Sequence, residues 1–261
     1  MKIGEKLEKA HEYIVNSYYI SDENLNHLES GKSRSEEKFK EKEIDTVKIN
    51  EYLKAFREWY DKYEYDKYIS FLSSSSAYNY AKEIKEITYN LPELNQEDIQ
   101  KIIEEIEKSV DTPEKSVYKA GIFISYLINE CCPEEEIEIE VGKSYYLLDY
   151  LGLYNKKVLT IYGNVGDVLG REMKKGKITV KGNANDWVGE EMKGGKIIVE
   201  GNAGNGVGYG MEGGIIDIKG YADYYVGSGM RGGKIYLEKD YKSISSDIRG
   251  GEIYHKGELV I

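Results

Sequence analysis

The chain has 261 residues, and its 36 lysines and arginines stand against 47 aspartates and glutamates, for a formal net charge of −11. This acidic balance gives no electrostatic basis for nucleic-acid binding, which needs clustered positive charge. The sequence also contains no run of about 18 apolar residues, which is the length needed to span a membrane. The first residues lack the apolar segment of a secretory signal, so we expect a cytoplasmic protein that binds neither nucleic acid nor membranes.

Residues 1–136 carry the whole negative balance and are predicted to form an all-helical domain. Apolar residues recur there at intervals of three and four, which places them on one face of a helix. A polar stretch at 21–35 separates an opening helix from the later ones. The recurring positions are Leu7, His11, Ile14 and Tyr18, then Ile49, Leu53, Phe56, Tyr60 and Tyr63, then Tyr80, Ile84 and Ile87, then Ile99, Ile102, Ile103 and Ile106, and finally Val117, Ile124, Leu127 and Ile128.

Start signals mark the last three of these helices. The serine run at 73–76 and Asn95 can cap two of them, and Thr112-Pro113 suits the opening of the third. The adjacent Cys131 and Cys132 near its end are poorly placed for a relaxed disulfide and too few for a zinc site. We therefore expect them to be packing residues, and the many tyrosines of this half to pack with their hydroxyls in water.

The composition changes near residue 136, where we place the boundary to a second domain, residues 137–261. Of the 28 glycines, only Gly4, Gly31 and Gly121 precede this point. Residues 137–155 begin with apolar residues alternating with glutamates but lack the regular glycines that follow. They are predicted to form a degenerate first coil of a stack, with its outer end covered by the helices, because terminal repeats of a stack are usually capped.

Residues 158–251 contain nearly the same sequence five times, with a period of 19 residues that shortens to 18 in the last repeat. A fixed period in this range indicates a stacked-repeat architecture. All methionines after Met1 fall in one column of the alignment. They form a predicted structural ladder of Met173, Met192, Met211 and Met230, with Ile248 in the fifth repeat.

Each repeat opens with a strand-like alternation of apolar and polar residues and then reaches a glycine. The predicted inward pairs are Leu159/Ile161, Ile178/Val180, Ile197/Val199, Ile216/Ile218 and Ile235/Leu237, followed by Val165, Ala184, Ala203 and Ala222 and by Leu169, Val188, Val207 and Val226. The glycine density would destabilise a helix by about 1 kcal/mol per residue, whereas tight corners favour glycine. Each repeat is therefore predicted to be one coil of a parallel β-helix, a single-stranded solenoid with 19-residue coils.

The pattern G-N-A-x-D-x-V-G-x-x-M-x-G-G-x-I-x-V, present at 182–199 and again in the next two coils, resembles the GXGXG domain. That domain forms one of the subunits of formylmethanofuran dehydrogenase and the C-terminal part of the large glutamate synthase polypeptide. The resemblance covers roughly residues 137–261. It implies a right-handed β-helix without catalytic, cofactor-binding or metal-binding residues, packed against the catalytic parts of a redox assembly.

Candidate chemistry in the repeats has structural explanations. Asp167 and Asp186 share a column that continues as Asn205 and Tyr224, and we expect them to bond turn amides; a glycosidic acid/base pair is the alternative. Asn164, Asn183 and Asn202 form a second column, predicted to be an amide ladder. The two G-x-G-x-x-G strings, at 208–213 and 227–232, precede strands rather than opening a helix, so they do not predict a dinucleotide site. We expect His255, on the inward parity of the last strand, to be a core residue.

Two features favour a protein partner or a homo-oligomer. Outward aromatic residues on neighbouring coils can form an apolar patch, and the predicted partner surface consists of Trp187, Tyr209, Tyr224, Tyr225 and Tyr236. The segment 252–261 is predicted to start another strand without a cap, leaving a parallel edge that invites pairing.

The sequence thus favours a non-catalytic scaffold or assembly component associated with oxidoreductase subunits, or a paralogue of one. A glutamate synthase-like accessory domain and a stand-alone hydrolase or lyase with Asp167, Asp186 and Glu190 on its flank are the alternatives. Scarce glutamine and histidine beside abundant lysine, glutamate and isoleucine are typical of a thermophile.

Overall fold

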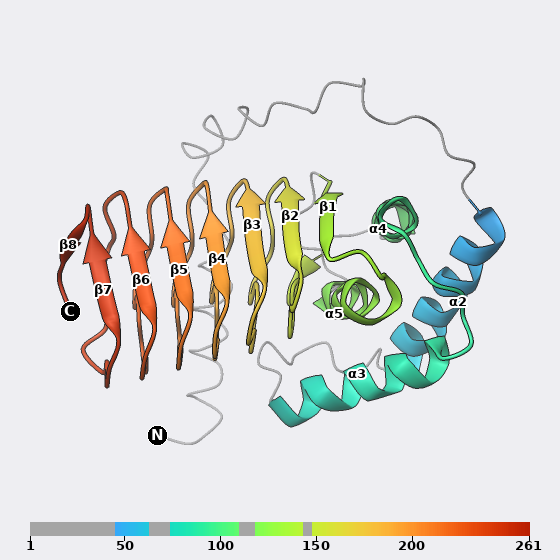
Figure 1. Cartoon of the computed structure of the whole chain (residues 1–261), viewed down its shortest axis with the longest axis horizontal. Coiled ribbons are helices and arrows are strands. Elements are labelled where there is room, and N and C mark those ends of the chain that lie inside the picture. The colour runs from blue at the N-terminus through green and yellow to red at the C-terminus, as the bar shows by residue number, and fades with distance from the viewer. Residues whose placement is uncertain (1–44, 63–73, 110–117, 143–147) are drawn as a thin grey trace, which may run out of the picture. The chain divides into compact units, whose positions relative to one another are not determined.

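A computed structural model describes residues 45–62, 74–109, 118–142 and 148–261, all within one compact unit that spans 41–261. The predicted helix around Leu7–Tyr18, the polar stretch at 21–35 and the Thr112-Pro113 start signal lie outside the described residues. The described unit combines helices with a parallel β-solenoid of about six turns over residues 136–255 (Figure 1).

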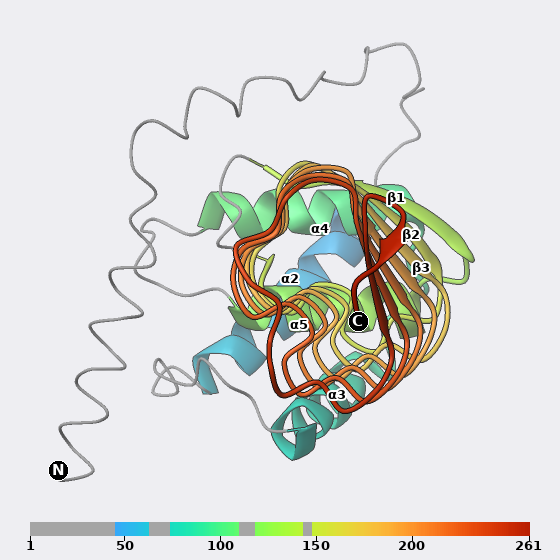
Figure 2. The same cartoon turned by 90° about the vertical axis from the view of Figure 1, so that its left-hand side faces the viewer.

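The solenoid contains one sheet in which the strands follow one another in chain order. Its strands are β1 Glu136–Glu140, β2 Val158–Tyr162, β3 Lys177–Lys181, β4 Lys196–Val199, β5 Ile215–Ile218, β6 Lys234–Leu237, β7 Glu252–His255 and β8 Glu258–Leu259. All neighbours from β1 to β7 pair in parallel. Seen along the stack, successive coils nearly superimpose (Figure 2).

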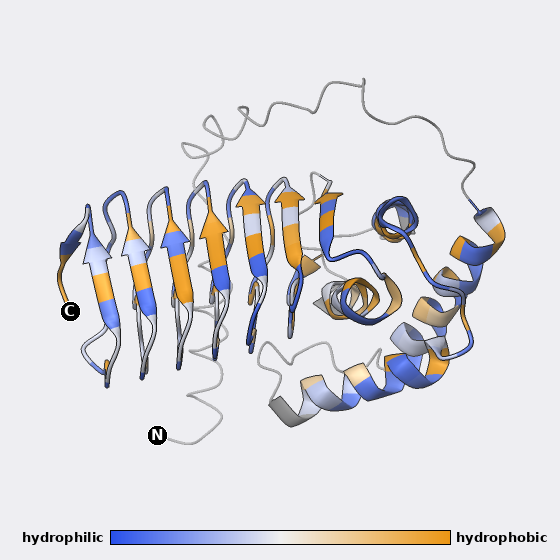
Figure 3. Cartoon of the chain, in the orientation of Figure 1, coloured by the Kyte–Doolittle hydropathy of each residue, from blue (hydrophilic) through white to orange (hydrophobic). Residues whose placement is uncertain are grey.

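The strand register aligns residues of like kind in columns. Leu159 pairs with Ile178, which pairs with Ile197, and the column continues to Ile253. All of these side chains are buried, as are the second inward column and the Val165/Ala184/Ala203/Ala222 column. The strands carry both hydrophobic and hydrophilic residues, although β4 is hydrophobic throughout Ile197–Val199 (Figure 3). The inward positions predicted from the alternation are therefore confirmed.

The four repeated methionines are fully buried, and each lies close to a corner glycine of the next coil. A Cβ added at Gly195 would lie 2.6 Å from Cε of Met173, and one at Gly214 would lie 2.7 Å from Cε of Met192. These glycines also have φ values of 83° and 94°, which other residues rarely adopt. Glycine is therefore required at this corner for two reasons: it adopts the positive φ of the turn, and it leaves room for the methionine methyl group.

The helices that precede the solenoid are α2 Thr46–Lys62, α3 Ser74–Thr88, α4 Gln96–Ser109 and α5 Tyr118–Tyr126, and α5 continues into a π-helical turn, η2 Leu127–Cys131. Their core is mostly aliphatic and includes an aromatic cluster, in which the ring centroids of Phe56 and Phe123 lie 5.2 Å apart and those of Trp59 and Tyr80 lie 5.7 Å apart. The helical core is continuous with the solenoid interior. The change of composition near residue 136 therefore marks a change of architecture within one compact unit.

The predicted cap of α4 is confirmed by two reciprocal hydrogen bonds. The Asp98 backbone N–H donates to Oδ1 of Asn95, and the Asn95 N–H donates to Oδ2 of Asp98, both at 2.9 Å. This arrangement satisfies donors that the first turn of a helix leaves open.

Polar side chains of α4 pair with the outer edge of β1. The N–H groups of Glu138 and Glu140 each donate to a glutamine Oε1, those of Gln96 and Gln100, at 2.8 Å. Nε2 of Gln100 donates back to the Glu140 carbonyl at 3.1 Å. These two side chains take the place of a preceding strand, so the predicted covering of the first coil by helices is confirmed.

α5 and η2 close another part of the first coil. The Gly152 N–H donates to Oγ of Ser125 at 2.8 Å, and Nδ2 of Asn129 donates to the Leu153 carbonyl at 3.2 Å. The contact is so close that a Cβ at Gly121 would lie 1.9 Å from the carbonyl oxygen of Asp149. Only glycine fits at this point of α5.

The other end of the stack differs from the prediction. The expected uncovered parallel edge at β7 is wrong, because the chain turns back and β8 pairs antiparallel with β7. Lys256 and Gly257 form the turn with φ values of 50° and 86°, and two positive φ values are typical of a tight hairpin. The Val260 N–H also donates to the Ile253 carbonyl at 2.8 Å. The edge of β7 is thus covered by its own chain, and it gives no argument for a partner.

Candidate functional site

The aromatic residues of the predicted partner surface are divided between two parts of the coil. Tyr209 lies on the turn between β4 and β5, and Tyr224 and Tyr225 follow β5. Tyr236 instead lies on β6, half-buried, and stacks on Tyr254 with ring centroids 4.9 Å apart. The predicted surface is therefore divided, because Tyr209, Tyr224 and Tyr225 lie on turns and Tyr236 lies on a strand.

A column of residues with positive φ underlies the turn group. Val168, Trp187, Gly206 and Tyr225 have φ values of 64°, 59°, 68° and 63°, a conformation that is rare for a β-branched residue such as valine. A Cβ at Gly206 would lie 2.7 Å from Cδ1 of Trp187, so the indole covers this glycine and is half-buried.

The tyrosines around this column are exposed. Tyr209, Tyr221, Tyr224 and Tyr225 expose 40%, 53%, 45% and 53% of their surface. The rings of Tyr224 and Tyr225 lie 6.0 Å apart, and Nζ of Lys242 lies 4.9 Å from the Tyr224 ring centroid. We call these four tyrosines and Trp187 the aromatic turn surface. Tyr221 is included in this surface, although it was not one of the five residues of the predicted partner surface.

The acidic column next to this surface has a structural role. The Asp186 N–H donates to Oδ1 of Asp167 at 3.1 Å, and the Asn205 N–H donates to Oδ1 of Asp186 at 2.7 Å. The column begins one coil earlier, where Asp149 accepts the Asp167 N–H at 2.8 Å. Burial raises the pKa of Asp186, although the hydrogen bonds from Asn205 oppose it. Burial, with a smaller contribution from the neighbouring Asp167, raises the pKa of Asp149. Each acid bonds a turn amide of the next coil, as expected.

The asparagine column works in the same way. The Asn183 N–H donates to Oδ1 of Asn164, and the Asn202 N–H donates to Oδ1 of Asn183, both at 2.8 Å. The last member accepts the N–H of Tyr221 at 2.9 Å. The predicted amide ladder is confirmed, and it fixes the backbone that carries one of the exposed tyrosines.

A buried charged cluster includes Glu190, which the hydrolase alternative would use. Oε2 of Glu190 lies 3.7 Å from Nη1 of Arg171, and the guanidinium also lies 3.3 Å from Glu191. Burial raises the pKa of Glu190 to about 7, with the nearby arginine opposing the shift. The carboxylate is thus engaged with a buried cation, an arrangement that ties two coils together.

The two cysteines match their predicted packing role. Cys132 is buried, with Sγ 2.8 Å from Oε2 of Glu134, and burial raises its pKa to about 12. Such a thiol stays protonated and is a poor nucleophile. Within the described ranges, no cluster of three or more histidine, cysteine or acidic side chains has metal-binding geometry. The part of the chain that the structure describes also contains no helix of the length and apolarity needed to cross a bilayer.

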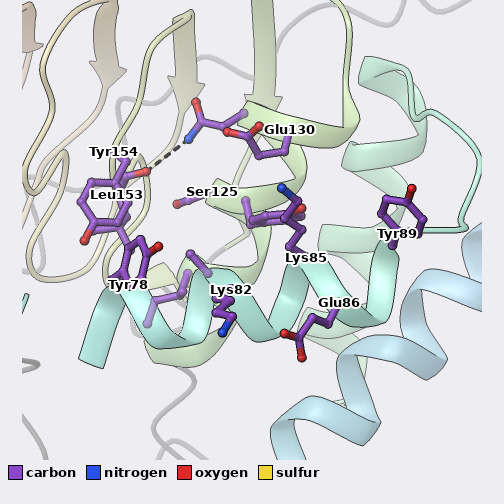
Figure 4. Close-up of a pocket in the computed structure, with 13 residues that line it drawn as sticks. Tyr78, Lys82, Lys85, Glu86, Tyr89, Ser125, Glu130, Leu153 and Tyr154 are labelled. Atoms are coloured by element: carbon purple, nitrogen blue, oxygen red, sulfur yellow. Dashed lines mark hydrogen bonds between the residues drawn. The ribbon is translucent and has the colours of Figure 1, made fainter. Parts of the chain in front are cut away.

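A cleft that the sequence did not reveal lies elsewhere. It has a volume of ≈ 810 Å³ and lies between α3 on one side and α5, η2 and residues 153–154 on the other (Figure 4). A smaller pocket of ≈ 620 Å³ adjoins it and shares Tyr78 and Tyr154 with it. The residues that line the cleft come from three segments that are distant in sequence, so no local motif could predict it. Four tyrosines line the cleft: Tyr78, Tyr89, Tyr126 and Tyr154.

Comparison of the chain with known protein families, with curated proteins and with solved structures finds no match.

Proposed function

We propose that the protein is a non-catalytic assembly component that binds a protein partner through its aromatic turn surface. The observation that carries the proposal is the exposure of four tyrosines, between 40% and 53% each, on turns of neighbouring coils. Exposed apolar patches of this kind are typical of interaction sites, and aromatic residues are enriched in the cores of interfaces.

The neighbouring groups support this assignment. The acids and amides next to the surface are engaged with backbone N–H groups of the next coil. They therefore hold the turns in register and present the aromatic rings on a rigid support. A rigid support favours binding because little conformational entropy is lost when the partner docks.

The identity of the partner follows from the resemblance to the GXGXG domain. On that basis we propose a right-handed solenoid with 19-residue coils, associated with oxidoreductase subunits as in a formylmethanofuran dehydrogenase assembly. A glutamate synthase-like role is the alternative, and it implies an amidotransferase-type partner.

The test is site-specific photo-crosslinking of the full chain in cells of its source, with a photoreactive residue in place of Tyr225. Cross-links to an oxidoreductase would support the proposal, and cross-links to an amidotransferase would favour the alternative. The double variant Tyr224→Ser/Tyr225→Ser should lose the cross-linked partner in a pull-down. Tyr89→Ser is the matched control, since Tyr89 is 77% exposed but lies on the helical side. A protein that forms only homo-oligomers, with unchanged elution in the double variant, would contradict the proposal.

A further inference from the structure

The cleft between α3 and the first coil has the size and lining of a small-ligand site. The ≈ 810 Å³ of the larger pocket and the ≈ 620 Å³ of the adjoining pocket each fall in the range of about 300–1,000 Å³ that is typical of such sites. The larger pocket has apolar wall residues, among them Ala81, Ile122 and Leu153. Both walls belong to one compact unit.

The polar groups on the deep side of the cleft are already satisfied. Ser125 accepts the Gly152 N–H at 2.8 Å and donates to the Gly121 carbonyl at 2.6 Å. Asn129 donates to the Leu153 carbonyl, the bond drawn dashed in Figure 4. A ligand would therefore meet a fixed wall here, and its specific contacts would come from the rim.

The rim is positively charged, in contrast to the net charge of −11 of the whole chain. Five lysines line the two pockets, and three glutamates accompany them. Lys156 pairs with Glu130 at 2.9 Å, and Glu172 pairs with a lysine outside the pockets at 3.1 Å. The remaining four ammonium groups have no ion-pair or hydrogen-bond partner among the described residues; they are Lys82, Lys85, Lys174 and Lys175.

The third glutamate does not offset this charge inside the cleft. In Figure 4, Lys85 and Glu86 extend from opposite sides of α3, and Lys85 lies on the side of Ser125 and Glu130. Concave surfaces lined by one sign of charge raise the local concentration of ligands of the opposite sign. The cleft therefore favours an anion.

Two tyrosines stand where the two pockets meet. Tyr78 is 65% exposed, although burial of such a ring against the core would be favourable. Tyr154 is half-buried, and its hydroxyl donates to Oε1 of Glu172 at 3.5 Å. Burial raises the pKa of Tyr154 to about 12, so this phenol remains neutral. A planar ligand ring can stack on such side chains, which contributes about 1–3 kcal/mol per base in nucleic-acid complexes.

We propose that this cleft binds a nucleoside phosphate, with the base in the larger pocket against Tyr78 and Tyr154 and the phosphate in the smaller pocket at Lys174 and Lys175. Lysine binds phosphate as a point charge, and the smaller pocket carries three lysines beside one glutamate. The two G-x-G-x-x-G strings take no part, since they lead into β5 and β6 on other coils. This site goes beyond the proposed assembly function.

The experiment is calorimetric titration of the purified full chain with AMP, ATP, GMP, GTP, CMP and UMP, and separately with adenosine and with inorganic phosphate. We expect at least one nucleotide to bind about tenfold or more tightly than adenosine or phosphate, since each fragment lacks one of the two contacts. Lys174→Ala/Lys175→Ala and Tyr78→Ala should each weaken that binding about tenfold, and the lysine effect should shrink at high salt.

Lys54→Ala is the matched control, because Lys54 is an exposed lysine on α2 outside the cleft, and it should bind like the parent. The replaced residues are exposed, so unchanged thermal unfolding of each variant should show that the fold is kept. The proposal is overturned if no nucleotide binds more tightly than about 1 mM, if phosphate or adenosine alone binds as well, or if the lysine and tyrosine variants bind like the control. No partner is present in this assay, so its outcome is independent of the assembly proposal.

Discussion

The two ends of the solenoid are closed in different ways. At β1, side chains from α4 and α5, as far as 42 residues away in sequence, hydrogen-bond the open backbone of the first coil. At β7, a two-residue turn folds the next few residues back onto the edge. The first closure depends on packing between distant segments, and the second depends on local backbone geometry. Stability should therefore be sensitive to substitutions at the helical end and tolerant at the hairpin end.

The largest difference in stability loss is expected between substitutions at Gly121, at the helical end, and at Gly257, at the hairpin end. Gly121→Val would drive a side chain into the carbonyl of Asp149, because even a Cβ would lie 1.9 Å from that oxygen. We expect a loss of about 3 kcal/mol or more, since α5 must move away from the first coil. Urea unfolding followed by circular dichroism measures it. A loss below about 1 kcal/mol would mean that α5 is not held against this coil.

A smaller effect is expected from the glutamines that cap β1. Gln96→Ala/Gln100→Ala removes the acceptors for two strand N–H groups, and each lost bond should cost about 1 kcal/mol. Gln96→Glu is the matched control, because Gln96 only accepts here and a carboxylate can accept the same N–H. Amide hydrogen exchange at Glu138 and Glu140 should accelerate in the alanine variant alone. Equal exchange in both variants would argue against the capping role.

Titration of the buried Glu190, on the coil between β3 and β4, should make the stability of the protein depend on pH. Burial raises the pKa of Glu190 to about 7, so the folded state holds this proton more tightly than the unfolded state. Its contribution is therefore fully present below about pH 4.5 and is lost as the pH rises through about 7, a change of about 1–3 kcal/mol. Stability profiles of the parent and Glu190→Gln should diverge between these values. Parallel profiles would show that this group does not titrate there.

At the hairpin end, the pH dependence should have the opposite sign to that of Glu190 and should be weaker. A hydrogen bond from Lys256 lowers the pKa of Asp240, so its contribution is present above the ordinary pKa of an aspartate and is lost as the pH falls through the lowered value. Asp240→Asn should change only exchange rates near β8, measured by NMR at pH 7 and at pH 3.

Gly257→Ala tests the backbone conformation of the turn between β7 and β8 without changing any charge. Nothing lies within 4 Å of a Cβ at Gly257, and its φ is 86°. The substitution should therefore cost about 1 kcal/mol through backbone strain alone. A larger loss of global stability would make the hairpin as important as the helical cap.

The sequence predicted the features that repeat and one local helix cap. The inward columns, the Asn95 cap and the asparagine ladder followed from spacing, because register forces like residues to meet. The further parallel strand predicted at 252–261 is present as β7, but the hairpin after it was missed although Lys256-Gly257 precedes a short apolar segment. Gln96 and Gln100 were noticed only for their scarcity. The cleft depends on how α3 meets residues 153–154, and no spacing in the sequence encodes that contact.

Because the interior contacts repeat from coil to coil, they do not fix the number of coils. The Ile197 side chain packs against Gly170, two repeats earlier in the sequence, and the Met192 methyl lies beside Gly214 of the following coil. A duplicated coil would meet surfaces of the same shape above and below, and neither closure would need to change. The chain could thus be lengthened or shortened in steps of about 4.8 Å, which would set how far the aromatic turn surface stands from the cleft.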